Sequence, residues 1–120
     1  MISLGPKISP FRTALTQSGA TVVIATGRLN FPEVEGLRQQ LHGLVEGGAI
    51  HLVVDLSGVQ AIDSSGVGAL ISGLKAARSH GGDLRLAAPP AAVASVLEIM
   101  NLNTLLVAHD SSESAFPQET

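Results

Sequence analysis

The fold of this chain is decided by the stretch VVDLSGVQAIDSSGVG, which spans residues 53–68. An apolar run opens it and predicts a buried strand, and a short loop connects that strand to a helix beginning at Asp63-Ser64-Ser65-Gly66. Two adjacent hydroxyls behind a carboxylate indicate a phosphate acceptor, because free N–H groups and the helix dipole favour an anion there. Asp and Ser are also ordinary N-cap residues, so the same four residues fit a helix start that binds nothing. The first interpretation makes this site a switch rather than a catalyst.

Length and composition limit the class of protein. The chain has 120 residues and no cysteine, which predicts one domain that buries a core without disulfides. With 45% apolar and 14% charged residues, the chain has the composition of a globular protein. A net charge of -3 with seven scattered Lys and Arg argues against nucleic acid as a partner. We see no signal-peptide pattern and no apolar run of about 20 residues, and therefore expect a cytoplasmic protein without membrane contact.

The N-terminal part predicts a hairpin followed by a helix. Residues 11–16 form a weak strand pattern, residues 20–26 are rich in β-branched side chains, and Gln17-Ser18-Gly19 supply a turn between them. Apolar residues then recur at helical spacing over residues 34–45, and Gly47-Gly48 end that helix. Asn30 with Glu33 three residues on resembles a capping box, which predicts how this helix starts.

The rest of the chain alternates strands and helices. Residues 50–56 are apolar without alternation, which indicates a central parallel strand covered on both faces. Further strands are predicted over residues 83–88 and 104–108. A helix follows Pro89-Pro90 with its apolar face at Val93, Val96, Leu97 and Met100, and a short helical turn covers residues 112–116. These elements predict an α/β sandwich with one shared core formed by Val53, Val54, Leu56, Val67, Leu70, Ile71, Leu74, Val96 and Leu97.

Three glycines lie inside the helix predicted to start near Ser64. Each costs about 1 kcal/mol of helix stability relative to alanine at an exposed interior position, so some compensating benefit is expected. For Gly73 we expect close packing against the sheet. For Gly66 and Gly68 two explanations remain open: close packing, or a surface kept free for another protein.

Other kinds of site are not supported by the sequence. None of the four histidines has a second ligand at the close spacing of metal sites, so we expect no metal and no other cofactor. Ser64 follows Ile62-Asp63 and does not lie in a Gly-x-Ser-x-Gly motif. Gly66-Val67-Gly68 starts like a dinucleotide fingerprint, but Ile71 occupies the third glycine position, and there is no P-loop lysine motif. We therefore expect no enzyme.

The segment from Leu52 to Leu70 resembles the centre of STAS domains, the family of bacterial anti-sigma factor antagonists, in which a hydrophobic strand with Asp-Leu-Ser leads to Asp-Ser-Ser-Gly. The similarity continues through residues 81–86 and 96–102, and covers about residues 20–116. It implies a STAS-like fold: a mixed, mostly parallel sheet of four to five strands, antiparallel only in the first hairpin, with about four helices. We expect a flexible leader over residues 1–9, the STAS domain over 10–116 and a C-terminal tail over 117–120.

The resemblance also implies a function. In this family the serine directly after the aspartate accepts phosphate, and here that residue is Ser64. The unmodified protein binds an anti-sigma factor that is also a serine kinase, phosphorylation releases it, and a phosphatase resets the system. We expect a monomer or weak dimer. The implied partner-binding residues are Arg28, Asn30, Asp63, Ser64, Ser65, Gly66 and Val67.

One departure from the family and two rival functions remain. The family often has an acidic residue and then Leu-Asp after the glycine that ends the second strand, whereas this chain has Gly27-Arg28-Leu29-Asn30. A cation and an amide therefore replace two carboxylates, which affects the identity of the kinase.

Two rival functions are considered. The first rival is a STAS scaffold subunit of a signalling or lipid-transport assembly, whose serine is not modified. The second rival, an enzyme or small-molecule binder, requires a polar pocket that the sequence does not reveal.

Overall fold

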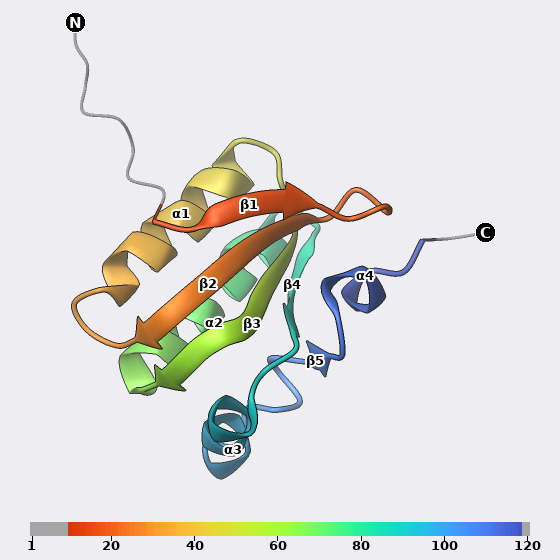
Figure 1. Cartoon of the computed structure of the whole chain (residues 1–120). Helices are drawn as coiled ribbons and strands as arrows, with labels where there is room; N and C mark the ends of the chain where they lie inside the picture. The colour runs from red at the N-terminus through yellow and green to blue at the C-terminus, as the bar shows by residue number, and fades with distance from the viewer. Residues whose placement is uncertain (1–9, 119–120) are drawn as a thin grey trace, which may run out of the picture.

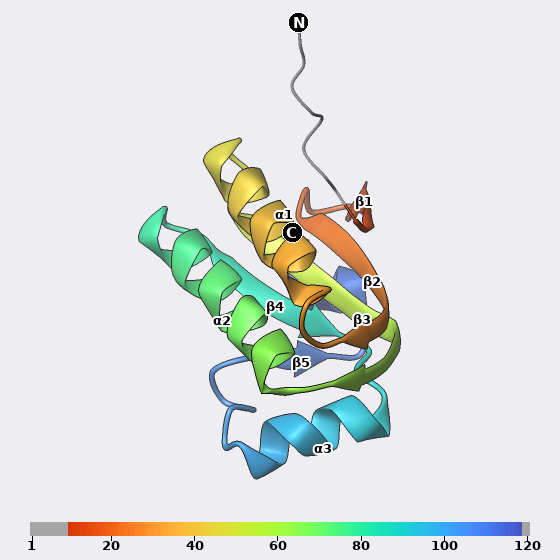
Figure 2. The same cartoon turned by 90° about the vertical axis from the view of Figure 1, so that its left-hand side faces the viewer.

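The computed structural model describes residues 10–118. The expected leader, residues 1–9, and the end of the expected tail, residues 119–120, lie outside this part. Figure 1 shows a five-stranded sheet in the spatial order β1-β2-β3-β4-β5 with helices packed around it. Figure 2 shows α1 and α2 side by side on one face, while α3 lies across one end of the sheet. The α/β class and the number of strands and helices agree with the prediction.

The strands are β1 Arg12–Leu15, β2 Thr21–Leu29, β3 His51–Ile62, β4 Asp83–Ala87 and β5 Ala108–His109. β1 pairs with β2 antiparallel, and every later pairing is parallel, as the resemblance implied. Two details differ from the prediction. The expected loop after Leu56 is strand up to Ile62, because two register irregularities in the β2–β3 ladder keep both strands paired to their ends. Of the last predicted strand only Ala108 lies in β5, although the Val107 carbonyl accepts from the Leu86 N–H at 2.9 Å. Before it the chain turns at Leu102, whose carbonyl accepts from the N–H groups of Leu105 and Leu106.

The helices are α1 Val34–Glu46, α2 Ser64–Ser79, α3 Ala91–Ile99 and α4 Ser112–Ala115. The capping box predicted for Asn30 and Glu33 is wrong. Glu33 itself is the N-cap of α1 and makes no side-chain cap bond. β2 continues to Leu29, so a turn is needed before the helix, and the Asn30 carbonyl accepts from the Val34 N–H at 3.1 Å. The backbone therefore closes the turn that we had assigned to side chains.

The buried side chains form two clusters, one on each side of the sheet. The larger cluster joins α1, α2 and α3 to the sheet and contains six of the nine expected core residues, while Ile71 and Val96 are partly buried against it. Val53 is the exception to the predicted single core. It lies in the second cluster with Ala20, Val22, Ala87 and Ala115, because alternate residues of a strand face opposite sides. Met100 of the predicted α3 face is exposed.

The second face of the sheet is covered by α4 and the residue after it. Arg85 of β4 donates from Nη1 to the Ala115 carbonyl at 2.6 Å, and its guanidinium lies 4.1 Å from the centroid of the Phe116 ring. The same side chain forms an ion pair with Asp83 at 3.1 Å. One arginine thus holds the C-terminal end of the described chain against the sheet.

Candidate functional site

The site is built where β3 passes into α2. β3 ends at Ile62, and Asp63 follows in an extended conformation as the N-cap of α2. Its Oδ1 accepts from the Gly66 N–H at 3.0 Å and from the Ser65 hydroxyl at 2.6 Å. The carboxylate therefore satisfies one of the free N–H groups of the first helical turn, as an N-cap aspartate does. It also fixes the neighbouring hydroxyl.

The two adjacent serines consequently have different roles. Ser65 is half-buried and its hydroxyl is used by Asp63, whereas Ser64 is exposed and its hydroxyl has no hydrogen-bond partner among residues 10–118. Hydrogen bonds, first from the Ser65 hydroxyl and then from the Gly66 N–H, lower the pKa of Asp63 below its ordinary value. At neutral pH an accessible hydroxyl thus stands directly beside a fixed negative charge.

The end of β2 and the residue after it, residues 28–30, lie next to this helix start. Arg28 pairs with Ala61 and Leu29 with Ile62 in the β2–β3 ladder, and Figure 1 shows the two strand ends side by side. The Asp63 N–H donates to the Leu29 carbonyl at 3.3 Å. Arg28 is exposed and Asn30 is half-buried. Of the predicted site residues, Arg28, Asn30, Asp63 and Ser64 therefore gather at one end of the sheet.

Of the three remaining predicted partner-binding residues, Ser65 is half-buried beside Asp63, and Gly66 and Val67 lie beneath this surface. Gly66 is buried, and Val67 is only 1% exposed within the larger core cluster. Val67 therefore supports the site from below and presents no side chain to a partner in this structure.

Comparison with known families gives a match that spans most of the described residues. The family model described as "Mlab, STAS domain" matches residues 13–108. The chain belongs to the STAS domain family. A comparison with curated proteins gives no match.

Solved structures share the STAS fold with this chain. The Thermotoga maritima protein TM1081 superposes with a TM-score of 0.80 at 24% identity, covering 88% of this chain and 90% of that one. The anti-sigma factor antagonist SpoIIAA of Bacillus superposes in its unphosphorylated form (TM-score 0.73, 21% identity, 87% and 91% covered) and in its phosphorylated form (0.67, 20%, 87% and 95%). The murine anion transporter Slc26a9 also contains the fold (0.66, 22%, 82% of this chain, 17% of the transporter). At these identities the likeness is one of fold.

The glycines of α2 separate into two kinds. A Cβ on Gly66 would lie 2.3 Å from the Leu29 carbonyl oxygen, and one on Gly73 would lie 2.8 Å from Leu41 Cδ1. Close packing against backbone therefore requires the glycine at position 66. Gly73 also packs closely, against the side chains of Leu41 of α1 and Leu84 of β4, so the expected contact with the sheet is present. A Cβ on Gly68 would meet no atom within 4 Å, and this residue is exposed. The fold of this STAS domain does not need a glycine at position 68.

This difference predicts opposite effects of two equal substitutions. Gly66→Ala is expected to destabilise the domain by about 1–3 kcal/mol, because the new methyl group forces the helix start away from the Leu29 backbone. Gly68→Ala is expected to stabilise it by up to about 1 kcal/mol through helix propensity. Urea denaturation of both variants and the parent measures the two changes. Equal effects of the two variants would contradict this assignment of their packing.

One exposed residue at the site was not found from the sequence. Phe31 follows Asn30 directly, is 72% exposed, and its backbone N–H is among the groups that lower the pKa of Asp63. The signal that could have identified it is rarity: the chain contains three phenylalanines and no tryptophan or tyrosine, so each of these large aromatic side chains is a candidate for a specific role. An aromatic side chain in the turn after a strand end is a candidate binding residue.

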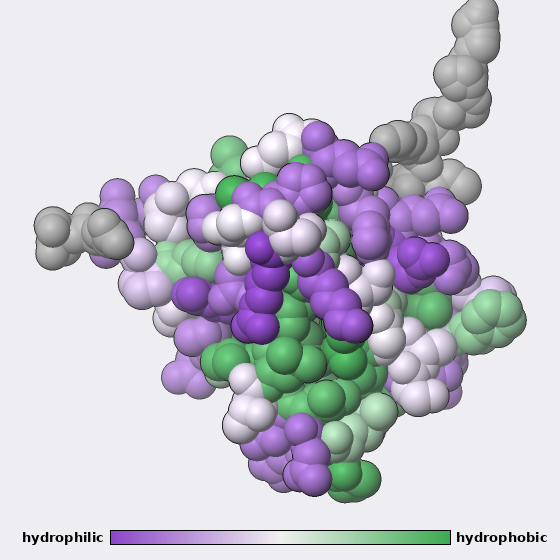
Figure 3. Space-filling model, turned by 180° about the vertical axis from the view of Figure 1, so that it is seen from behind, coloured by the Kyte–Doolittle hydropathy of each residue, from purple (hydrophilic) through white to green (hydrophobic). Residues whose placement is uncertain are grey.

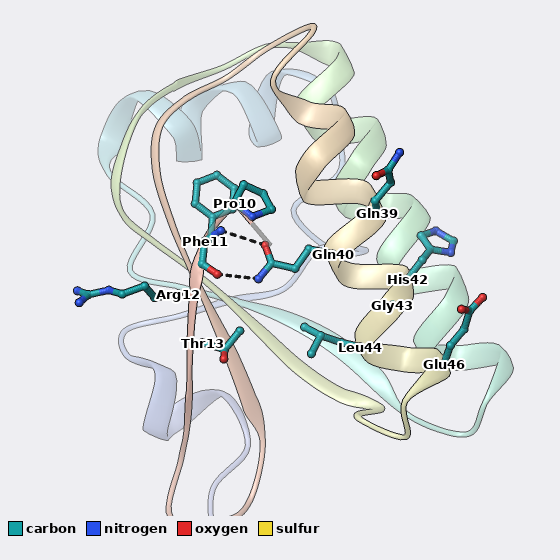
Figure 4. Close-up of a pocket in the computed structure, with 10 residues that line it drawn as sticks. All are labelled: Pro10, Phe11, Arg12, Thr13, Gln39, Gln40, His42, Gly43, Leu44 and Glu46. Carbon is teal, nitrogen blue, oxygen red and sulfur yellow. Dashed lines mark hydrogen bonds between the residues drawn. The ribbon is translucent and has the colours of Figure 1, made fainter. Parts of the chain in front are cut away.

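A separate cleft of about 730 Å³ lies between β1 and α1 (Figure 4). Its floor includes Gln40, which is buried and pairs with the backbone N–H and carbonyl of Phe11 at 3.2 and 2.7 Å. His42 on its rim bonds through Nε2 to the Ser72 hydroxyl at 2.6 Å. None of the predicted site residues lines this cleft.

Two further observations bear on function. Within the described part of the chain, no cluster of three or more His, Asp or Glu side chains is placed to hold a metal ion. None of the helices in residues 10–118 combines the length and the apolar content needed to cross a bilayer.

Proposed function

We propose that this STAS domain is an anti-sigma factor antagonist that acts by reversible binding in the cytoplasm and not by catalysis. The unmodified form binds an anti-sigma factor that is also a serine kinase, and so frees a sigma factor. Phosphate transfer to Ser64 ends that binding, and a phosphatase restores the unmodified form. The observation that carries the proposal is the accessibility of Ser64: it is the one hydroxyl of the Asp-Ser-Ser motif that is exposed and unbonded within residues 10–118.

The position of Ser64 suits an added phosphate. It is the first residue of a 16-residue helix, where unpaired N–H groups and the helix dipole stabilise negative charge. The Asp63 carboxylate beside it stays ionised at neutral pH, so the modified site carries concentrated negative charge. Such a site stays folded while its surface changes from a small neutral hydroxyl to a hydrated anion.

Arg28 and Asn30 set the charge of the neighbouring surface. They occupy the turn whose family counterpart is often acidic, and they lie beside the helix start through the β2–β3 ladder. We infer that the cognate kinase carries an acidic or neutral group opposite Arg28, because charges across an interface are complementary. A kinase whose surface suits an acidic turn would then be disfavoured.

Phosphorylation with the cognate kinase and ATP, followed by peptide mapping, tests the acceptor. We expect phosphate on Ser64 in preference to Ser65. The chain holds an internal control, because Asp110-Ser111-Ser112 repeats the tripeptide: Ser111 follows the aspartate as Ser64 does, and Ser112 is the first residue of a helix as Ser64 is. Phosphate on Ser65, on Ser57, or equally on Ser112 would contradict recognition of the Ser64 site.

A second candidate is a STAS scaffold subunit that is not modified. It is favoured by an apolar area that reaches the end of the molecule formed by α3 in Figure 3, where Ile99 is 82% and Met100 39% exposed. The family description and the presence of the fold in a transporter are consistent with it. Pull-down of partners with and without ATP separates the two: the switch loses its partner when ATP is present, and the scaffold keeps it.

A further inference from the structure

Phe31 is an apolar residue in a turn whose backbone is anchored beside the proposed acceptor. The Leu29 carbonyl on one side accepts from the Asp63 N–H, and the Asn30 carbonyl accepts from the Val34 N–H. Phe31 therefore lies in a turn whose backbone is bonded both to the start of α2 and to α1. Its ring nevertheless is 72% exposed, so it contributes little to the core.

An isolated exposed apolar residue needs no special explanation on its own. Three features distinguish Phe31. It adjoins the helix start where the exposed Ser64 follows the Asp63 cap, and it follows Arg28 at the end of β2 and comes directly after Asn30. It is also a rigid aromatic side chain with few rotatable bonds, the type that loses little conformational entropy on binding and that dominates the energy of protein interfaces.

Taking the proposed function as its basis, we propose that Phe31 is the apolar anchor by which the kinase that modifies Ser64 holds this domain. The partner surface that it fits is an apolar pocket next to the kinase's phosphate-transfer site, with a complementary group for Arg28 at its edge. The anchor acts on binding and does not touch the reacting atoms. Because the Asp63 N–H donates to the Leu29 carbonyl, the turn that carries Phe31 is linked to Ser64, and a kinase holding Phe31 also positions Ser64 for phosphate transfer.

The test compares two substitutions of Phe31 with one substitution of Leu15, an apolar residue with nearly the same exposed fraction. Phe31→Ala removes the ring, Phe31→Tyr keeps it, and Leu15→Ala removes an equally exposed apolar side chain (73%) on β1, which pairs with the opposite end of β2. Each is measured for its Kd with the cognate kinase without ATP, for KM and kcat of Ser64 phosphorylation, and for Tm.

For Phe31→Ala we expect Kd and KM to rise about tenfold or more, kcat to stay within about twofold, and Tm to stay unchanged. Phe31→Tyr and Leu15→Ala are expected to match the parent. Parent-like binding by Phe31→Ala, or an equal loss in Leu15→Ala, overturns the anchor while leaving the switch intact. Failure of the proposed function itself shows in the parent chain, which then neither binds the kinase nor accepts phosphate on Ser64.

Discussion

Ser64→Asp is expected to weaken association with the proposed anti-sigma factor by about 2 kcal/mol or more, roughly 30-fold in Kd. The reason is desolvation: a surface that receives a neutral hydroxyl meets a charge that it cannot hydrate or pair. Asp63 strengthens the effect, because its pKa is already lowered and both carboxylates are ionised at neutral pH. Titration calorimetry with the parent and the variant measures the change.

Ser64→Ala is the matched control. It keeps the site neutral, so it is expected to bind as the parent does and to stay bound in the presence of ATP. Neither substitution touches the core, since Ser64 is exposed and unbonded within the described residues, and thermal melts of both variants should follow the parent. Unchanged binding by Ser64→Asp, or loss of its fold, would show that charge at this position does not cause release.

Leu70→Ala lowers the free energy of unfolding by about 2–5 kcal/mol. Leu70 is fully buried on the face of α2 that packs on α1 and β4, at the centre of the larger cluster. Its truncation removes apolar contacts and leaves a cavity between rigid neighbours. Chemical denaturation measures the loss, and Lys75→Ala, an exposed position on the same helix, serves as the control for helix effects. A change near zero would mean that this helix face is not the one that holds the sheet.

Most of the fold could be predicted because local patterns and tertiary packing agree. The unbroken apolar run over residues 50–56 predicted the central strand, and the spacing of Val67, Leu70 and Leu74 predicted the buried face of α2. The prediction of a single core was wrong because it ignored the alternation of side chains along a strand. Val53 and Val54 are adjacent in a strand covered on both sides, so they had to face different layers. Applying the two-residue period of a strand would have separated them.

The start of α1 and the length of β3 could not be predicted from local signals. Asn30 and Glu33 have the spacing of a capping box, but the pairing of β2 with β3 extends to Leu29 and imposes a turn first. Ser57, Gly58 and Gln60 are ordinary loop residues in the sequence. They are strand residues here because β2 supplies backbone partners alongside.

For the candidate site, the sequence named residues but not how they are arranged. The sequence identified Asp63, Ser64 and Ser65 without showing which hydroxyl is used by the cap. It also left Gly66 and Gly68 equivalent, because a close approach to the Leu29 carbonyl depends on how α2 crosses β2. Phe31 was missed since its exposure is a property of the turn and not of a motif.

The twelve-residue β3 is the longest strand of the sheet and ends at Ile62, directly before the N-cap of α2. Ser64 is therefore attached to this strand through Asp63 alone and does not lie in a free loop. A kinase that engages it has no local chain to order, and association carries little of the entropic penalty that mobile substrate segments impose. Under the proposed switch, phosphate transfer and partner dissociation would limit the exchange between bound and released forms. Ordering of the acceptor segment would add no delay, so the response would be as fast as the kinase and phosphatase turn over.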